Sequence, residues 1–200
     1  MSEQDREWAA NTLADVPHPR LILNVGARWL TKRWPPSHFA DVALRASREI
    51  GASLIAVGSP EDRPLVDALK ERLGDVPLLD LCGATTLPQL AALSAASDCV
   101  LSNDTGPLHL AAASGVPVVG IYTCTMPWST GPYGPNAHVV QTRVWCAESC
   151  LKTCPRMECM SELTVERVWM AVRQRMEAGS YLGRPNCNRS AVIDDQKSVA

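Results

Sequence analysis

The feature that most constrains the fold is a strand, a polar turn, a helix and a second strand that follow one another without a break. In order they are Cys99–Leu101, Ser102–Gly106, a short apolar helix that opens at Pro107, and Val116–Tyr122. Proline suits the first turn of a helix, because its missing N–H would have no partner there. Asp104 or Thr105 can serve as the N-cap, and Gly115 ends the helix. Two buried strands joined by a helix predict a parallel crossover unit.

The turn before this helix predicts an anion site. A strand, a glycine-containing turn and a helix N-terminus bring free N–H groups and the positive end of the helix dipole to one spot. We therefore expect a ligand that carries phosphate. The alternative is an ordinary, well-capped turn of an α/β protein, and local chemistry alone leaves both open.

The rest of the chain also alternates buried strands with amphipathic helices. Further strands are expected at Leu21–Val25, Leu54–Val57, Leu78–Leu81 and His138–Val140. Helices are expected at about 37–50 and 86–96, after Thr164, and after the loop 58–62, where Leu65, Val66, Leu69 and Leu73 share one side. This pattern predicts an α/β fold with a doubly wound parallel sheet, Rossmann-like. Its ligand should lie at the carboxyl ends of the strands, where Gly26–Lys32, Gly58–Asp62, Asp104–His109 and Tyr122–Trp128 would meet.

Composition narrows the class of protein. With 46% apolar and 20% charged residues, the chain of 200 residues is globular. A net charge of −2 without a dense basic block argues against a nucleic-acid partner. No apolar run approaches the ~20 residues that span a bilayer, and the first ten residues are too polar for a secretory signal. These features predict a cytoplasmic protein.

Four of the eight cysteines, Cys146, Cys150, Cys154 and Cys159, lie within 14 residues. Their spacing fits neither a zinc ribbon nor a ferredoxin run, and a reducing cytoplasm disfavours disulfides. Structural free thiols, a metal site and a disulfide all stay open. Of the other cysteines, Cys82 and Cys99 are expected to be small buried apolar residues, and Cys124 and Cys187 are isolated in the sequence.

The segment from Asp104 to Tyr122, D-T-G-P-L-H-L-A-A-A-S-G-V-P-V-V-G-I-Y, closely resembles the donor-binding segment of glycosyltransferase family 9, the ADP-heptose:lipopolysaccharide heptosyltransferases. Gly26-Ala27-Arg28 and Lys32-Arg33-Trp34-Pro35 resemble the opening of that family's second domain, and the cysteine cluster resembles the ending of many members. The resemblance covers about residues 20–176. Met126-Pro127-Trp128 departs from the family's usual G-x-T-x-P loop, with Thr123-Cys124-Thr125 in place of a glycine, which leaves the donor contacts of this loop open.

This resemblance implies the donor-binding half of an inverting, metal-independent GT-B glycosyltransferase. The donor would be ADP-heptose or a related nucleotide sugar, the acceptor a lipopolysaccharide core at the inner membrane surface, and no cofactor or metal would be needed. Residues 20–178 would form the nucleotide-sugar-binding domain, after a polar extension at 1–19 and before a tail, 179–200, that we expect to be flexible. About 20 residues precede the first strand, so we expect the acceptor domain and its general base to be missing here, and a partner chain could supply them.

Two other functions stay open. One is a non-catalytic remnant that holds a nucleotide sugar, and the other is a GT-B enzyme that uses a UDP-sugar.

The loops after the first three expected strands contain five candidate site residues. Lys32 is the expected phosphate contact, since its ammonium would offset charge on a diphosphate leaving group; the alternative is a solvated lysine. Arg28 belongs to the same loop, and Arg33 is expected to face solvent. The resemblance implies that Glu61 binds the ribose, a role that Asp62 could also fill, and that Thr85 lines the adenine pocket. Either carboxylate could instead be a simple helix cap.

The turn after Leu101 supplies the other four. Gly106 would let the backbone approach the diphosphate, with the N–H groups of Thr105 and Gly106 as donors. The resemblance implies that Asp104 holds sugar hydroxyls and that His109 sits beside the phosphates. His109 could also be a purely structural residue.

Overall fold

Six parallel strands form one sheet in the computed structural model, which describes the backbone of residues 1–181 and the side chains of residues 1–177. The strands are β1 (Arg20–Asn24), β2 (Ser53–Val57), β3 (Leu78–Asp80), β4 (Cys99–Asn103), β5 (Val118–Tyr122) and β6 (Ala137–Gln141). Their order is β3-β2-β1-β4-β5-β6, and every neighbouring pair is parallel. The doubly wound parallel sheet predicted from the sequence is confirmed. The strand order reverses between β1 and β4, where ligands of such folds bind.

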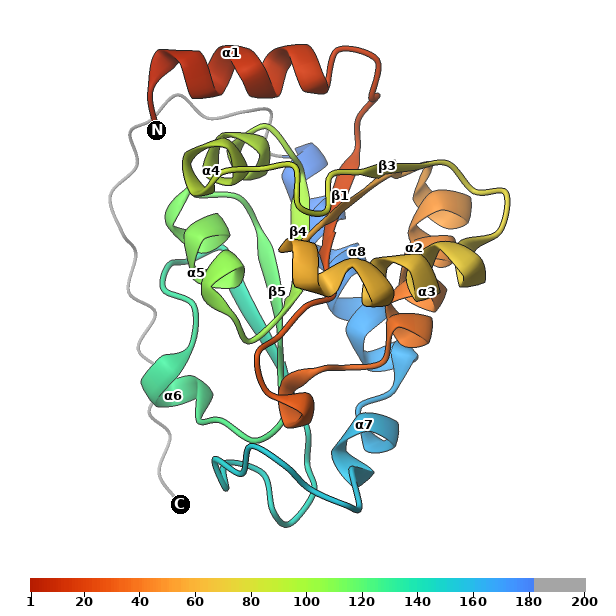
Figure 1. Cartoon of the computed structure of the whole chain (residues 1–200), viewed down its shortest axis with the longest axis vertical. Helices are drawn as coiled ribbons and strands as arrows, with labels where there is room; N and C mark the ends of the chain where they lie inside the picture. Colours follow the sequence, from red (N-terminus) through yellow and green to blue (C-terminus); the bar gives the residue numbers. More distant parts are fainter. Residues whose placement is uncertain (182–200) are drawn as a thin grey trace.

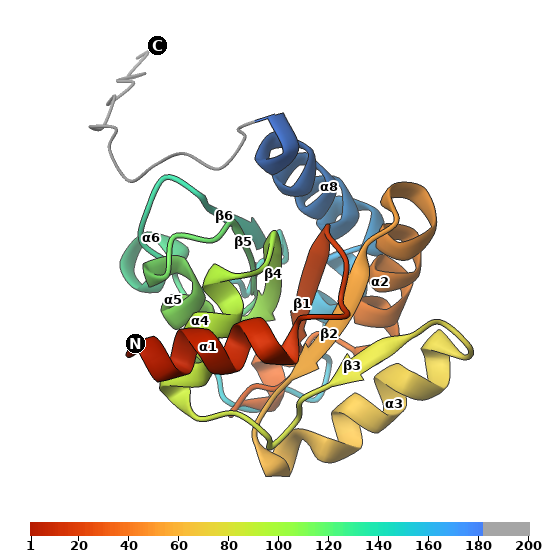
Figure 2. The same ribbon diagram turned by 90° about the horizontal axis from the view of Figure 1, so that it is seen from above.

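Helices cover both faces of the sheet, as Figures 1 and 2 show. They are α1 (Glu3–Thr12), α2 (Pro36–Ile50), α3 (Arg63–Leu73), α4 (Leu87–Ala95), α5 (Gly106–Ala113), α6 (Pro127–Thr130), α7 (Glu158–Glu162) and α8 (Val165–Tyr181), with 3-10 turns η1 (Leu30–Lys32) and η2 (Pro60–Asp62). The side chains of α2, α3 and α8 share one apolar core with the sheet, and those of α1, α4 and α5 share another. None of the helices within residues 1–181 is long and apolar enough to cross a bilayer.

The helix α2 illustrates how sequence pattern becomes packing. Its apolar residues recur at helical spacing, and Phe39, Val42 and Ala46 are fully buried against the sheet. Gly51 ends the helix with a φ of 67°, a left-handed conformation that glycine adopts without strain. The expected helix at about 37–50 is therefore confirmed.

The first 19 residues contain more structure than their polar composition predicts. Ser2 caps α1 through a reciprocal pair of bonds with Asp5. Ala9 is buried, and Leu13, just after α1, lies in the same apolar core as the leucines of α4. The apolar face of α1 is too narrow to give a clear period in the sequence. The predicted tail at 179–200 lies outside the described residues, apart from the end of α8.

Candidate functional site

At one edge of the sheet, the loop after β1 contacts the loop after β2, and the loop after β2 contacts the loop after β3. A methyl group on Gly26, just after β1, would overlap the Asp62 carboxylate of the β2 loop. Gly83, in the β3 loop, donates its backbone N–H to Gly58 O at 2.8 Å. The loops after β1, β2 and β3 therefore form one continuous surface.

Asp104 occupies the centre of this surface, at the switch point between β1 and β4. Its Oδ2 lies 2.6 Å from Lys32 Nζ and accepts a hydrogen bond from Thr125 Oγ1 at 2.6 Å. His109 Nε2 lies 3.7 Å from the other oxygen, Oδ1. Only 5% of Asp104 is exposed. The neighbouring Tyr122 is buried as well, and its burial, together with the negative charge of Asp104, raises the pKa of its phenol. The structure thus brings together three side chains predicted separately: Lys32, Asp104 and His109.

The N-terminus of α5 opens beside this carboxylate. Thr105 is the N-cap residue, but its side chain makes no capping bond to the helix. Its hydroxyl instead accepts a hydrogen bond from Asn24 Nδ2 at 3.0 Å. A methyl group on Gly106 would meet no heavy atom within 4 Å. The first N–H groups of α5 therefore keep their capacity to bind an anion, with space for one beside Gly106.

Asn103 holds the lysine loop in place, a role that the sequence analysis did not assign. Its Oδ1 accepts the backbone N–H of Trp34 at 3.1 Å, and its Nδ2 donates to Val25 O at 2.8 Å. Both ends of the loop that carries Lys32 are thereby tied to the end of β4. A polar residue at the end of an otherwise apolar strand was the signal available in the sequence.

Arg33 also differs from expectation. It was expected to face solvent, as a neighbour of Lys32 without a role in the site. The structure shows it half-buried, with Nε donating to Ala27 O at 2.6 Å. Arg33 therefore braces the loop after β1, while Arg28 in the same loop is exposed.

The β2 and β3 loops distinguish two neighbouring carboxylates. Asp62 Oδ2 accepts from both the N–H and the hydroxyl of Ser59 at 2.9 Å, in a capping box. The Glu61 carboxylate is exposed, and its own backbone N–H and the Ser59 hydroxyl lower its pKa. Asp62 is thus committed to the loop, and Glu61 is the more accessible acceptor. Thr85, half-exposed, follows β3 in the loop that contacts the β2 loop.

Two lysine ammonium groups lie near the ring of Trp29, which belongs to the same loop as Lys32. Lys32 Nζ lies 4.6 Å from the centroid of the Trp29 ring, and Lys152 Nζ lies 5.3 Å from it. Both positions allow a cation–π interaction. Lys152 comes from the cysteine-rich segment, so this segment also adds positive charge near Lys32.

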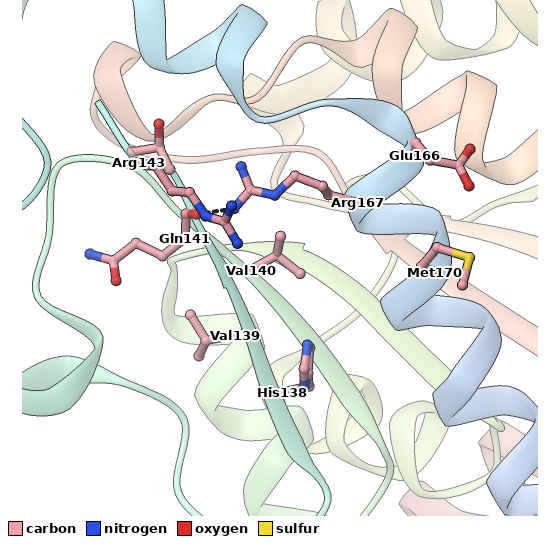
Figure 3. A pocket seen from close by; sticks show the side chains of 9 residues that line it. His138, Val139, Val140, Gln141, Arg143, Glu166, Arg167 and Met170 are labelled. Atoms are coloured by element: carbon pink, nitrogen blue, oxygen red, sulfur yellow. Dashed lines mark hydrogen bonds between the residues drawn. The ribbon is translucent and has the colours of Figure 1, made fainter. Parts of the chain in front are cut away.

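A separate groove runs between the edge strand β6 and α8 (Figure 3). Arg167 reaches from α8 to β6 and donates a hydrogen bond to Gln141 O at 2.6 Å. His138 of β6 and Met170 of α8 also line the groove. None of the predicted site residues lines this groove. We therefore place the candidate site at the loops around Asp104.

The cysteine cluster contains thiols of different character. The seven cysteines among the described residues are all unbridged, and within residues 1–181 no three potential ligands converge on a metal position. Hydrogen bonds from the N–H groups of Met157 and Arg156 lower the pKa of Cys154. Burial raises the pKa of Cys159 to about 11. Cys187 lies outside the described residues.

These opposite shifts predict an order of alkylation. Because the thiolate is the reactive form, Cys154 should react with iodoacetamide at a lower pH than an ordinary thiol, and Cys159 only near pH 11. Mass spectrometry of each peptide, after short exposures across a pH series, measures both profiles. In urea the two profiles should merge, and identical profiles in the folded chain would contradict the assignment.

Comparisons with known proteins converge on one family. The family model of glycosyltransferase family 9 (heptosyltransferase) matches residues 1–160. Lipooligosaccharide heptosyltransferase 2 of Campylobacter jejuni serotype O:2 is 34% identical over 155 residues, which are 74% of this chain and 48% of that protein. A glycosyl transferase family 9 structure from Veillonella parvula has a TM-score of 0.76 at 25% identity, covering 89% of this chain and 53% of that one.

The fold likeness extends to E. coli ADP-heptose lps heptosyltransferase II. Its structure has a TM-score of 0.70 at 24% identity, covering 90% of this chain and 53% of that one. The chain thus spans about half the length of the relatives that it matches.

Proposed function

The chain belongs to glycosyltransferase family 9, the heptosyltransferase family, and on that premise we propose that it binds ADP-heptose as the donor half of a heptosyltransferase. The observation that carries the proposal is the Lys32–Asp104 ion pair beside the open N-terminus of α5. A cation, a carboxylate and free N–H groups at one point match a ligand that joins a diphosphate to a sugar. The name of the E. coli structural neighbour includes ADP-heptose, which favours this donor over a UDP-sugar.

Lys32 and the start of α5 would bind the diphosphate. The ammonium would turn from Asp104 to the phosphates, and the N–H groups of Thr105 and Gly106 would donate from the opposite side. As the bond between the sugar and ADP breaks, negative charge grows on the leaving phosphate, and these donors stabilise it. Lys32 therefore stabilises the leaving group. His109 would lie beside the same phosphates, and Arg28, in the loop that carries Lys32, would add a further positive charge.

Glu61 and Thr85 would bind the adenosine. Asp62 is held by Ser59 under Gly26, so Glu61 is the carboxylate left to accept the ribose hydroxyls. Thr85 follows β3, at the far end of the same surface, where it would line the adenine pocket. Asp104 would accept the hydroxyls of the sugar.

The transfer itself requires an acceptor hydroxyl and a base. The acceptor oxygen attacks the anomeric carbon of heptose, the bond to the diphosphate breaks, and ADP leaves with the electron pair while the base takes the acceptor proton. Attack from the face opposite ADP inverts the anomeric centre, and no cofactor or metal takes part. We place the acceptor, a lipopolysaccharide core, and the base on a second domain or partner chain, at the cytoplasmic surface of the inner membrane.

One further function is favoured by a specific observation. All the groups around Asp104 are assigned to the donor, and the same arrangement would serve a module that binds the nucleotide sugar without transferring it. Turnover measured with and without an added acceptor-binding domain separates this binding module from a donor half.

Substitution of the ion pair tests the donor site. Lys32→Ala should weaken binding of both ADP and ADP-heptose by about 1.5–3 kcal/mol, the range for a hydrogen bond to a charged group. Asp104→Ala should weaken ADP-heptose by a similar amount but should not weaken ADP, because the carboxylate would bind only the sugar of the donor and competes with the phosphates for Lys32. Isothermal titration calorimetry measures all four affinities.

Lys70→Ala is the matched control, because Lys70 also pairs with an aspartate, Asp80, but on an exposed helix face. It should leave both affinities unchanged. Equal losses for the two ligands in both site variants would reject the division of roles.

A further inference from the structure

The loop after β5 is the part of the site that departs from the family pattern, and it bonds Asp104 and Thr31, the residue before Lys32. Its residues Thr123, Cys124 and Thr125 are all buried. A surface loop with three buried small polar side chains is unusual, since such groups need hydrogen-bond partners when water is excluded. Each of the three has a partner within the site.

Thr125 holds the carboxylate. Its Oγ1 donates to Asp104 Oδ2 at 2.6 Å, the same oxygen that lies 2.6 Å from Lys32 Nζ. Thr125 is 6% exposed and Asp104 is 5% exposed, so water competes little for this bond. With two donors on Oδ2, the rotation of the carboxylate is fixed, and Oδ1 is directed to the side of His109, 3.7 Å away.

The two residues before Thr125 hold the lysine loop. The Thr123 hydroxyl donates to the carbonyl oxygen of Thr31, and Cys124 Sγ contacts Thr31 Oγ1 at 3.4 Å. Thr31 in turn donates to Leu151 O at 2.6 Å and directly precedes Lys32. One short loop thereby fixes the backbone that carries the ammonium and the side chain that carries the carboxylate.

We propose that Thr125 is a positioning residue that sets sugar recognition by aiming Asp104 Oδ1 at the hydroxyls of the donor sugar. The inference rests on the proposed function of the same site. When a phosphate draws Lys32 away, Thr125 is the donor that remains on Oδ2 and keeps the carboxylate in its orientation. Without this hydroxyl, the carboxylate can rotate, and the sugar hydroxyls lose a fixed acceptor. The diphosphate contacts do not depend on that orientation.

The test compares the affinities for ADP and ADP-heptose by calorimetry. Thr125→Val keeps the shape of the side chain and removes the hydroxyl. It should lower the affinity for ADP-heptose about tenfold, the low end of what a hydrogen bond to a charged group contributes, and change the affinity for ADP less than about twofold. Thr125→Ser, which keeps the hydroxyl, should restore most of the loss. Thr130→Val is the control, because the Thr130 hydroxyl bonds only the nearby Met126 O at 3.1 Å on an exposed helix.

A double-mutant cycle with Asp104→Ala gives a readout that a merely structural residue would not affect. If Thr125 acts through the carboxylate, Thr125→Val should have no further effect on the ratio of the two affinities in the Asp104→Ala background, where the carboxylate is absent. An additive effect, an equal loss for ADP and ADP-heptose, or a failure of serine to restore binding would overturn the inference. Absence of binding of both ligands by the unmodified protein would instead reject the proposed function, so the two failures are distinguishable.

Discussion

Incubated with ADP-heptose and a lipopolysaccharide core acceptor, the 200-residue chain should bind the donor and transfer no heptose above the uncatalysed rate. The groups assigned here bind the donor and stabilise ADP as it leaves, but none of them holds an acceptor. Holding two reactants in register can supply about 7–11 kcal/mol of a barrier, and a positioned base adds a further ~10²–10⁴-fold. This is the largest effect that we expect. Calorimetry for donor binding and a coupled assay for ADP release measure the two halves of the prediction.

The matched experiment adds the acceptor-binding domain of a family 9 relative as a separate protein. Transfer should then depend on both components and should fall with Lys32→Ala. Trp128, Tyr133 and Trp145, in the segments after β5 and β6, are 77%, 94% and 80% exposed, which suits docking of another domain. Steady multiple turnover by the chain alone would contradict the prediction and would mean that it contains a base not assigned here.

Replacement of Trp34 by alanine should destabilise the fold by about 3–5 kcal/mol, the usual cost of removing a fully buried Trp or Phe side chain. Trp34 is 0% exposed and packs edge-on against Phe39, with ring centroids 5.3 Å apart. Its Nε1 donates to Leu163 O at 2.8 Å, so the substitution also leaves a buried carbonyl without this partner. Urea denaturation monitored by circular dichroism measures the change in the free energy of unfolding.

Trp128→Ala is the matched control, because Trp128 is 77% exposed, and it should change the free energy of unfolding by less than about 0.5 kcal/mol. Trp34→Phe should fall between the two, since it keeps an aromatic ring and loses the bond to Leu163. If Trp34→Ala and Trp128→Ala destabilise the chain equally, the role of Trp34 as the core anchor of the lysine loop is wrong.

Much of the fold follows from the sequence, because two simple patterns set it. Short apolar runs such as Leu21–Val25, which alternate with helical patterns, are typical of strands buried on both faces, and parallel strands put their following loops on one edge. Lys32 and Asp104 are 72 residues apart in the sequence, yet this rule alone predicts that they meet. Their direct contact in the structure bears out the convergence of the loops, while their roles toward a ligand stay predictions.

What the sequence does not contain is the choice of partner within the site. Thr125 bonds Asp104, but Thr105 bonds Asn24, although both are threonines beside the same carboxylate. That difference depends on where each side chain points and on shifts of its hydroxyl by a few ångströms, which no pattern of residue types encodes. Arg33 was misjudged for the same reason, because only the curvature of its loop brings its side chain to Ala27 O. The helix α1 was missed because its buried face is so small.

The ion pair at the centre of the site has a consequence for how fragments of the donor compare with the whole molecule. Lys32 and Asp104 already neutralise each other at 2.6 Å, so an incoming phosphate gains only the difference between its own attraction for the ammonium and that of the carboxylate. A free phosphate ion also leaves the buried carboxylate without its cation, which costs free energy. A sugar alone would bond only Oδ1, while the ammonium stayed on Oδ2, and it would gain nothing from Lys32 or from the start of α5. Only a ligand that carries both groups replaces both halves of the pair, so its binding free energy should exceed the sum for its separate fragments.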